Sequence, residues 1–267
     1  MPAGFEGCGD VVAAGAGAEG LMGKRVAFAV SQNGSGAWAE YALTDAATCI
    51  PLRSGVSDID GSAQIVNPLT AMAMVDIAAA EGGAFVISAA TSQLGKLMIS
   101  LAKDMNLQVI ALVRRDQAVA PLKELGATEV LVTTDPDFAT HFTKISHTYK
   151  PRIFLDAVSD KISETVFTLM PNNARWICYG ILGTAAPVLT QMGQFIFMGK
   201  RIEGFWLRNW MRNTPSADKA RVVGEVQARF ADGRWKTDVA ATLRLDEVID
   251  GLADATKLTD GKVIITP

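Results

Sequence analysis

The sequence predicts an α/β fold of the Rossmann type, built on a six-stranded parallel sheet, together with a second, smaller β module. Short apolar runs alternate with helical patterns over residues 67–207, which implies right-handed crossovers and a parallel sheet buried on both faces. Residues 1–66 are rich in glycine and alternate short β-type runs with turns. Residues 208–267 end in a β-type pattern, which suggests that the C-terminus returns to the first module.

The composition narrows the class of protein. Hydrophobic residues make up 49% of the 267 residues and charged residues 20%, as is typical of a globular protein with a substantial core. The net charge is −3 with both signs spread along the chain, so nucleic acid is not the expected partner. No apolar run approaches the ~18–20 residues that span a bilayer, and the N-terminus does not resemble a signal peptide. We therefore expect a cytoplasmic protein without a membrane partner.

The chain lacks the residue spacing of a metal site or a disulfide framework. Cys8, Cys49 and Cys178 are far apart and odd in number. His141 and His147 lie in a polar stretch, where two surface histidines are the simpler interpretation. We expect no bound metal and a reducing compartment.

The elements of the two modules can be assigned in order. In the first module, residues 26–30 and 37–42 have the pattern of strands joined by a turn at residues 33–36. The strands of the parallel sheet are expected at residues 84–88, 109–113, 130–132, 153–157, 175–179 and 201–205. Ser92 is placed to cap the helix after the first of these strands, and Ser216 to cap a helix over about residues 216–231. A final strand is expected at residues 263–266.

The turn after the first parallel strand is the candidate cofactor site. A dinucleotide site needs a strand, a tight turn and then a helix whose N-terminal N–H groups face the pyrophosphate. Ala89 stands where the first glycine of such a turn is usual, and only Gly95 of the glycine pattern survives. The residues that we expect to hold the pyrophosphate are Ser92, Gln93, Leu94 and Gly95. The alternative is an ordinary strand–helix turn.

The end of the second parallel strand indicates which dinucleotide binds. Arg114 lies 19 residues after Gly95, close to the offset at which such folds contact the adenosine ribose, and Arg115 follows it. Arginine can pair with a 2′-phosphate through charge-assisted hydrogen bonds, whereas an acidic residue there favours NAD. The sequence therefore favours NADPH. A solvated arginine pair at a strand end is the alternative.

Several motifs in order along the chain resemble one family. These are Gly4-Phe5-Glu6-Gly7, then Asn67-Pro68-Leu69-Thr70-Ala71, Tyr179-Gly180-Ile181 and Phe205-Trp206-Leu207. The chain resembles the zinc-independent branch of the medium-chain dehydrogenase/reductase superfamily, which includes quinone oxidoreductases and mitochondrial-type 2-enoyl thioester reductases. Zinc-dependent members carry histidine where Phe5 stands, so the resemblance implies no metal.

The resemblance implies roles for residues outside the turn. It places Tyr179, Gly180 and Ile181 against the nicotinamide ribose, and Phe205, Trp206 and Leu207 against the carboxamide. It also implies that Asn67 and Lys262 help to position the reactive half of the cofactor. Each has a structural alternative. Asn67 could cap a helix, and Lys262 could be a turn lysine. Tyr179 could be an ordinary strand residue, and Phe205 and Trp206 could be core aromatic residues.

The resemblance further implies that residues 1–66 are a partial GroES-like catalytic module, residues 67–207 the Rossmann domain and residues 208–267 a segment returning to the catalytic module. Family members normally carry several tens of residues before the Gly-Phe-Glu segment, including the tyrosine that protonates the substrate. Tyr41, Tyr149 and Tyr179 do not occupy that motif, so we assign no catalytic residue. The β module is accordingly expected to be incomplete.

The expected function is NADPH-dependent hydride transfer to an enone, a 2-enoyl thioester or a quinone, without zinc. The alternative is a non-catalytic NADPH-binding protein or a truncated remnant that lacks the proton donor. The resemblance also implies a homodimer formed through the last parallel strand, near residues 201–205.

Overall fold

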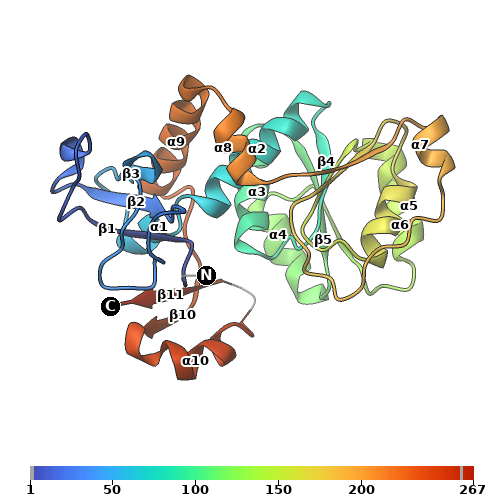
Figure 1. The fold of residues 1–267 in the computed structure, drawn as a ribbon. Helices are drawn as coiled ribbons and strands as arrows, with labels where there is room; N and C mark the ends of the chain where they lie inside the picture. The colour runs from blue at the N-terminus through green and yellow to red at the C-terminus, as the bar shows by residue number, and fades with distance from the viewer. Residues whose placement is uncertain (1–2, 259–260) are drawn as a thin grey trace. The chain divides into compact units, whose positions relative to one another are not determined.

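The computed structural model describes residues 3–258 and 261–267, and these fold as two compact units. The first unit combines the N-terminal residues up to Thr70 with the C-terminal residues from Pro215 onward (Figure 1). The second unit holds Ala71–Thr214. The domain boundaries expected after residues 66 and 207 stay predictions.

The second unit is built on a six-stranded parallel sheet, which confirms the predicted fold class. The strand order is β6-β5-β4-β7-β8-β9, so the chain reverses its direction of travel across the sheet beside β4 (Figure 1). The strands are β4 (Ala84–Ile87), β5 (Gln108–Val113), β6 (Glu129–Val132), β7 (Ile153–Asp156), β8 (Arg175–Cys178) and β9 (Arg201–Gly204). Each lies where the sequence predicts it. The apolar runs of β4, β5 and β7 are buried, as is typical of central parallel strands, whereas β9 is exposed.

Helices pack on this sheet and bury its central strands. Strands β4 and β7 are buried along their whole length. Phe142, Phe154, Phe167 and Trp176 belong to one core cluster, in which the rings of Phe154 and Trp176 stack 6.1 Å apart. The helices with all or most of their length in this unit are α2 (Val66–Ala80), α3 (Gln93–Asp104), α4 (Val119–Leu125), α5 (Phe138–Tyr149), α6 (Lys161–Leu169), α7 (Gly193–Phe197) and α8 (Leu207–Asn213), with a 3₁₀ turn at Asp116–Ala118.

The first unit contains the smaller β module. Strands β1 (Glu6–Asp10), β2 (Arg25–Ala29) and β3 (Cys49–Pro51) form an antiparallel sheet, and β10 (Val239–Arg244) pairs in parallel with β11 (Lys262–Thr266). Its helices are α1 (Asp58–Ser62), α9 (Ser216–Ala231) and α10 (Val248–Ala255), and its 3₁₀ turns are Glu19–Leu21, Ala46–Thr48 and Leu245–Glu247.

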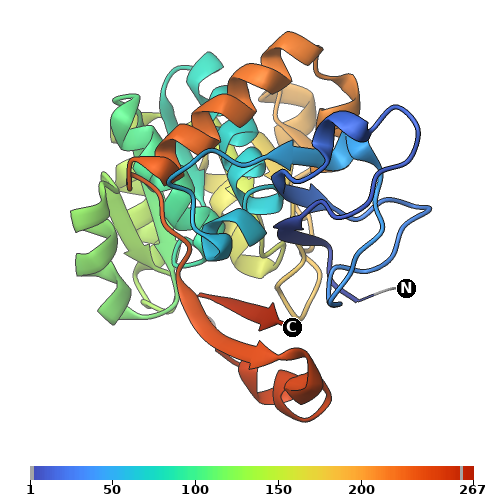
Figure 2. The ribbon, with the colours of Figure 1, turned by 90° about the vertical axis from the view of Figure 1, so that its left-hand side faces the viewer.

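Helix α9 ties the C-terminal part of this unit to its N-terminal part (Figure 2). The Gln227 side chain is buried, its oxygen accepts the Arg53 N–H at 2.7 Å, and its nitrogen donates to the Pro51 carbonyl at 2.9 Å. A buried amide needs such partners, because an unpaired polar group costs about 1–3 kcal/mol. One glutamine therefore joins segments that are far apart in the sequence.

Two local predictions are wrong. Residues 37–42 form bends instead of a strand. The alternating pattern is present, but a strand also needs a partner. Here the backbone N–H groups of Ala37 and Trp38 donate to Gly4 and Ala3, whereas that of Ala39 turns back to Ala37. The cap of α9 is also displaced by one residue, since Pro215 occupies the N-cap position and Ser216 is the first helical residue.

Candidate cofactor site

The turn between β4 and α3 lies beside the strand where the sheet order reverses. Ala89 has a φ of +47°, in the left-handed region that glycine usually occupies. Ser92 caps the helix as predicted, because its Oγ accepts the Gly95 N–H at 3.1 Å. A Cβ on Gly95 would lie 2.6 Å from the Ala90 carbonyl oxygen, so the helix approaches the turn more closely than any side chain allows.

This geometry suits an anion. Gln93, Leu94 and Gly95 are buried and Ser92 is half-buried, so the four predicted residues lie together in one compact turn. The first turn of a helix carries N–H groups that the helix itself cannot pair, and its dipole adds partial positive charge. The close packing at Gly95 is the role of the last glycine in a dinucleotide-binding turn, and in this respect the residues present fit a dinucleotide.

A buried carboxylate organises the carboxyl ends of the neighbouring strands. Asp156, the last residue of β7, is 0% exposed. Its Oδ1 accepts the Ser88 hydroxyl at 2.5 Å and the Val158 N–H at 2.9 Å. Its Oδ2 accepts the Trp176 indole N–H at 2.9 Å and the Ser159 N–H at 3.0 Å. Asp156 thus ties together β4, β8 and the loop after β7.

The loop after β7 in turn fixes the loop after β8. Leu182 N–H donates to the Ala157 carbonyl at 2.9 Å, and Gly183 N–H donates to the Val158 carbonyl at 2.8 Å. A Cβ on Gly180 would lie 2.8 Å from the Ala157 oxygen. The loop that carries Tyr179, Gly180 and Ile181 is therefore held by backbone contacts that leave no room for a side chain at Gly180.

A cavity of about 600 Å³ lies against these loops. Its lining includes Ser159, Tyr179, Gly180, Ile181 and Phe205. Tyr179 as a whole is half-buried, but its hydroxyl is buried without a hydrogen-bond partner, and burial raises the pKa of Tyr179 well above its ordinary value. This hydroxyl therefore stays protonated at neutral pH.

The remaining predicted residues of this unit follow other strands at the same edge. Arg114 and Arg115 come directly after β5 and are exposed. Phe205 follows β9 and donates its N–H to the Cys178 carbonyl at 2.8 Å. Trp206 is 59% exposed, with the Arg208 guanidinium 5.7 Å from its ring. Because parallel strands place their carboxyl ends along one edge, these residues share an edge with the turn at Gly95.

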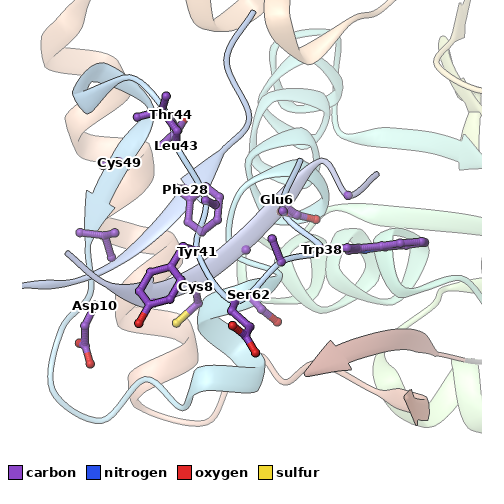
Figure 3. A pocket seen from close by; sticks show the side chains of 18 of the residues that line it. Glu6, Cys8, Asp10, Phe28, Trp38, Tyr41, Leu43, Thr44, Cys49 and Ser62 are labelled. Atoms are coloured by element: carbon purple, nitrogen blue, oxygen red, sulfur yellow. The ribbon is translucent and has the colours of Figure 1, made fainter. Parts of the chain in front are cut away.

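Two predicted residues, Asn67 and Lys262, lie in the first unit. Asn67 is the second residue of α2, and Lys262 begins β11. The Lys262 ammonium lies 3.3 Å from the Glu6 carboxylate. Both Glu6 and Lys262 line a cavity of about 1070 Å³ within this unit, part of whose lining is labelled in Figure 3.

Among the described residues, no group of three or more His, Cys, Asp or Glu side chains is arranged to hold a metal ion. Burial raises the pKa of all three free cysteines, and that of Cys8 reaches about 11, with Asp58 adding to the effect. No helix in the described ranges is long and apolar enough to cross a membrane.

Comparison with known proteins identifies the family. A family model described as zinc-binding dehydrogenase matches residues 94–221. A solved structure from Mesorhizobium loti, provisionally assigned as an NADPH:quinone reductase, is 48% identical, has a TM-score of 0.95, and is matched over 100% of this chain and 78% of its own. The chain belongs to the medium-chain dehydrogenase/reductase superfamily.

Curated members of the medium-chain dehydrogenase/reductase superfamily show more distant similarity. The mitochondrial enoyl-[acyl-carrier-protein] reductase of Arabidopsis thaliana is 24% identical over 87% of this chain and 63% of its own length. The corresponding protein of Rattus norvegicus is 30% identical over 79% of this chain and 57% of its own. The chain therefore spans less than two thirds of the length of these relatives.

The sequence analysis of this medium-chain dehydrogenase/reductase did not predict the contacts of two carboxylates, Asp156 in one unit and Glu6 in the other. Asp156 could have been noticed as a carboxylate at the end of an apolar run. The contacts of Glu6 have no such local signal, because they depend on segments far away in the sequence, whereas the positive φ of Ala89 agrees with its place where a glycine is usual.

Proposed function

We propose that the chain binds NADPH at the carboxyl edge of its six-stranded sheet and uses it to reduce an activated carbon–carbon double bond, as in a 2-enoyl thioester, or a quinone. One arrangement carries this proposal. Beside the strand at which the strand order reverses, the helix lies so close to the preceding turn at Gly95 that only glycine fits, and Arg114 and Arg115 follow the adjacent strand. The names of the enoyl reductase and quinone reductase relatives support this range of substrates.

Each part of the proposed site has a physical task. The amides of the first turn of α3, with Ser92, bind the diphosphate, and the guanidinium groups of Arg114 and Arg115 bind the 2′-phosphate. The segments after β8 and β9, at Tyr179–Ile181 and Phe205–Leu207, orient the nicotinamide. The roles of Asn67 and Lys262 stay predictions from the resemblance. When bound, the reduced nicotinamide supplies the hydride, and no zinc is required.

A binding titration followed by a turnover assay tests the proposal. We expect NADPH to quench tryptophan fluorescence at concentrations at least about tenfold below those of NADH, since two charged hydrogen bonds contribute more than 1.4 kcal/mol. Equal affinity for the two cofactors would refute the role of the arginine pair. Oxidation of NADPH by crotonyl thioester, compared with a simple quinone, then separates the two substrates. Tight binding without turnover on either would instead support a non-catalytic NADPH-binding protein.

We further propose a homodimer formed through β9. All four residues of β9 are exposed, and β9 lies at one edge of the six-stranded sheet. An open strand edge offers backbone groups to a second chain. Light scattering at several concentrations should report a dimer, and Ile202→Pro, which removes an N–H and adds bulk on this edge, should report a monomer.

A further inference from the structure

The crossover between β8 and β9 differs from the other crossovers of the parallel sheet. The other four pass through helices of 7 to 12 residues, α3 to α6, whereas this one contains only α7, of 5 residues. Residues 179–192, which we call the β8–α7 loop, contain neither helix nor strand. Loops longer than about 12 residues without secondary structure are uncommon in compact domains and are usually functional.

The β8–α7 loop forms one wall of the cavity of about 600 Å³, which residues 184–187 line. The beginning of the loop is fixed by the hydrogen bonds of the Leu182 and Gly183 N–H groups to the loop after β7. Residues 184–190, in contrast, make no hydrogen bond to any residue that the structure describes. Exposed segments without hydrogen bonds open at a low cost in free energy. The wall of the cavity is therefore held at its two ends.

The far end of the loop is held through a buried lysine. Lys200, directly before β9, is 2% exposed. Its Nζ donates to the carbonyl groups of Phe167 at 2.7 Å and Thr168 at 2.9 Å in the last turn of α6, and to Oε1 of Gln194 in α7 at 2.8 Å (Figure 1). The Lys200 backbone N–H also donates to the Gln194 carbonyl, at 3.2 Å. The three donors of one ammonium group thus meet three acceptors and join α7 to α6.

The surroundings of this ammonium are polar but uncharged. The last carbonyl groups of a helix carry partial negative charge, and the Phe167 ring centroid lies 5.3 Å from Nζ, so both favour a cation. No carboxylate of a described residue forms an ion pair with Lys200. A buried charge without an opposite charge retains much of its desolvation cost. The contact is therefore well satisfied in hydrogen bonds but electrostatically unfavourable.

We propose that Lys200 is a latch, whose buried ammonium group holds the far end of the β8–α7 loop on α6, and that this wall of the cavity opens when the side chain leaves its three acceptors. The latch lies wholly within the second unit. The inference goes beyond the proposed function, because it describes the chain without a cofactor and does not depend on which ligand the cavity takes.

Protonation sets the strength of this latch. Burial lowers the pKa of Lys200 from 10.5 to about 8. When the latch opens, the amine is in water and regains its ordinary pKa. Between pH 8 and 10.5 the closed state therefore binds fewer protons than the open state, so raising the pH through this range favours the closed state.

Other ionisable groups do not cause this shift. Helix α7 carries none, and burial is the one cause that lowers the pKa of Lys200. The ionisable groups on the elements packed around it are Lys161 and Glu164 of α6, Arg175 and Cys178 of β8, and Arg201 and Glu203 of β9. The pH dependence is therefore expected to follow Lys200 alone.

Amide hydrogen exchange in the protein without cofactor tests the latch. The reporters are the N–H groups of Gln194, Phe195 and Lys200, each of which donates a backbone hydrogen bond in or beside α7. Their protection factors, which already account for the intrinsic effect of pH on exchange, should rise about tenfold from pH 7 to pH 9, as pKa values of about 8 and 10.5 for the closed and open states require. A constant protection factor in the wild type would overturn the proposal.

Three variants show whether Lys200 is the group that titrates. Lys200→Met carries no ionisable group, so its protection factors should change less than about twofold between the two pH values. Lys200→Arg keeps hydrogen-bond donors but stays charged, so it should also lose the rise, and it serves if the methionine variant does not fold. The matched control is Lys161→Met, at the exposed start of α6, which should keep the tenfold rise. A rise that persists without Lys200 would overturn the proposal.

Labelling of Cys178 with iodoacetamide then tests whether the wall opens with the latch. This thiol lines the cavity and is free. The rate in the wild type, divided by the rate in Lys200→Met or Lys200→Arg at the same pH, cancels the titration of the thiol itself. This ratio should fall about tenfold from pH 7 to pH 9, because the closed wall hides the thiol more often. The same ratio for Cys49, in the other unit, should stay constant. A constant ratio for Cys178 would overturn the link between the latch and the cavity, whether or not the chain binds NADPH.

Discussion

Replacing Asp156 with asparagine tests the network that joins the strands around the candidate site. The substitution preserves shape but turns one acceptor oxygen into an NH₂ group. Each oxygen now accepts two donors, Ser88 and Val158 on one side and Trp176 and Ser159 on the other. In either orientation of the asparagine amide, its NH₂ group therefore faces two hydrogen-bond donors, at a position that is 0% exposed.

The expected loss can be estimated from these contacts. At least one buried N–H loses its acceptor, which costs about 1–3 kcal/mol. The bonds that remain weaken because the acceptor is no longer charged, and charge-assisted bonds are roughly twice as strong as neutral ones. Removing the cost of burying a charge offsets part of this. For Asp156→Asn we expect the free energy of unfolding to fall by about 3 kcal/mol.

Urea unfolding, followed by tryptophan fluorescence and circular dichroism, measures this loss. Asp137→Asn is the matched control, because Asp137 is exposed and makes no side-chain cap bond, and we expect a change within about 0.5 kcal/mol. NADPH affinity should also fall for Asp156→Asn, since the loops after β7 and β8 depend on it. A loss below about 1 kcal/mol would show that the network does not hold these strands as described.

Four further outcomes are expected. Gly95→Ala should weaken NADPH binding at least about tenfold and cost about 1–3 kcal/mol in thermal unfolding, because its Cβ would lie 2.6 Å from a backbone oxygen; normal binding would contradict the close approach. Ala89→Gly should stabilise the protein by up to about 1 kcal/mol, since relief of ~1–2 kcal/mol of left-handed strain exceeds the entropic cost, and a clear loss of stability would argue against the strain. Arg114→Ser should lower affinity for NADPH but not for NADH. Arg201→Ser should change neither affinity, because Arg201 stands at the start of β9 whereas Arg114 follows the end of β5. Alkylation of Cys8 at pH 8 should be about a hundredfold slower than for a thiol of pKa 9.0 and should accelerate as the pH rises toward 11, because a raised pKa leaves less thiolate; rapid labelling in the folded protein would contradict its burial.

Local sequence patterns were sufficient to predict the parallel sheet and the turn after its first strand. The apolar runs that became β4, β5 and β7 are a local pattern, because strands buried on both faces consist almost entirely of apolar residues; β9 is exposed, and its position follows from the alternation of strands and helices. The cap at Ser92 and the need for glycine at Gly95 are equally local, since both depend on residues within a few positions.

The pairing of distant polar groups depends on how the whole chain packs, and local patterns did not predict it. Residues 37–42 alternate like a strand but form bends, since a strand requires a partner that its own pattern does not specify. The bond from Asp156 to Trp176 and the pair of Glu6 and Lys262 join segments 20 and 256 positions apart. Such contacts follow from the way whole strands and helices pack. The periodicity of the sequence indicates only the face on which a residue lies, and it does not identify the residue opposite.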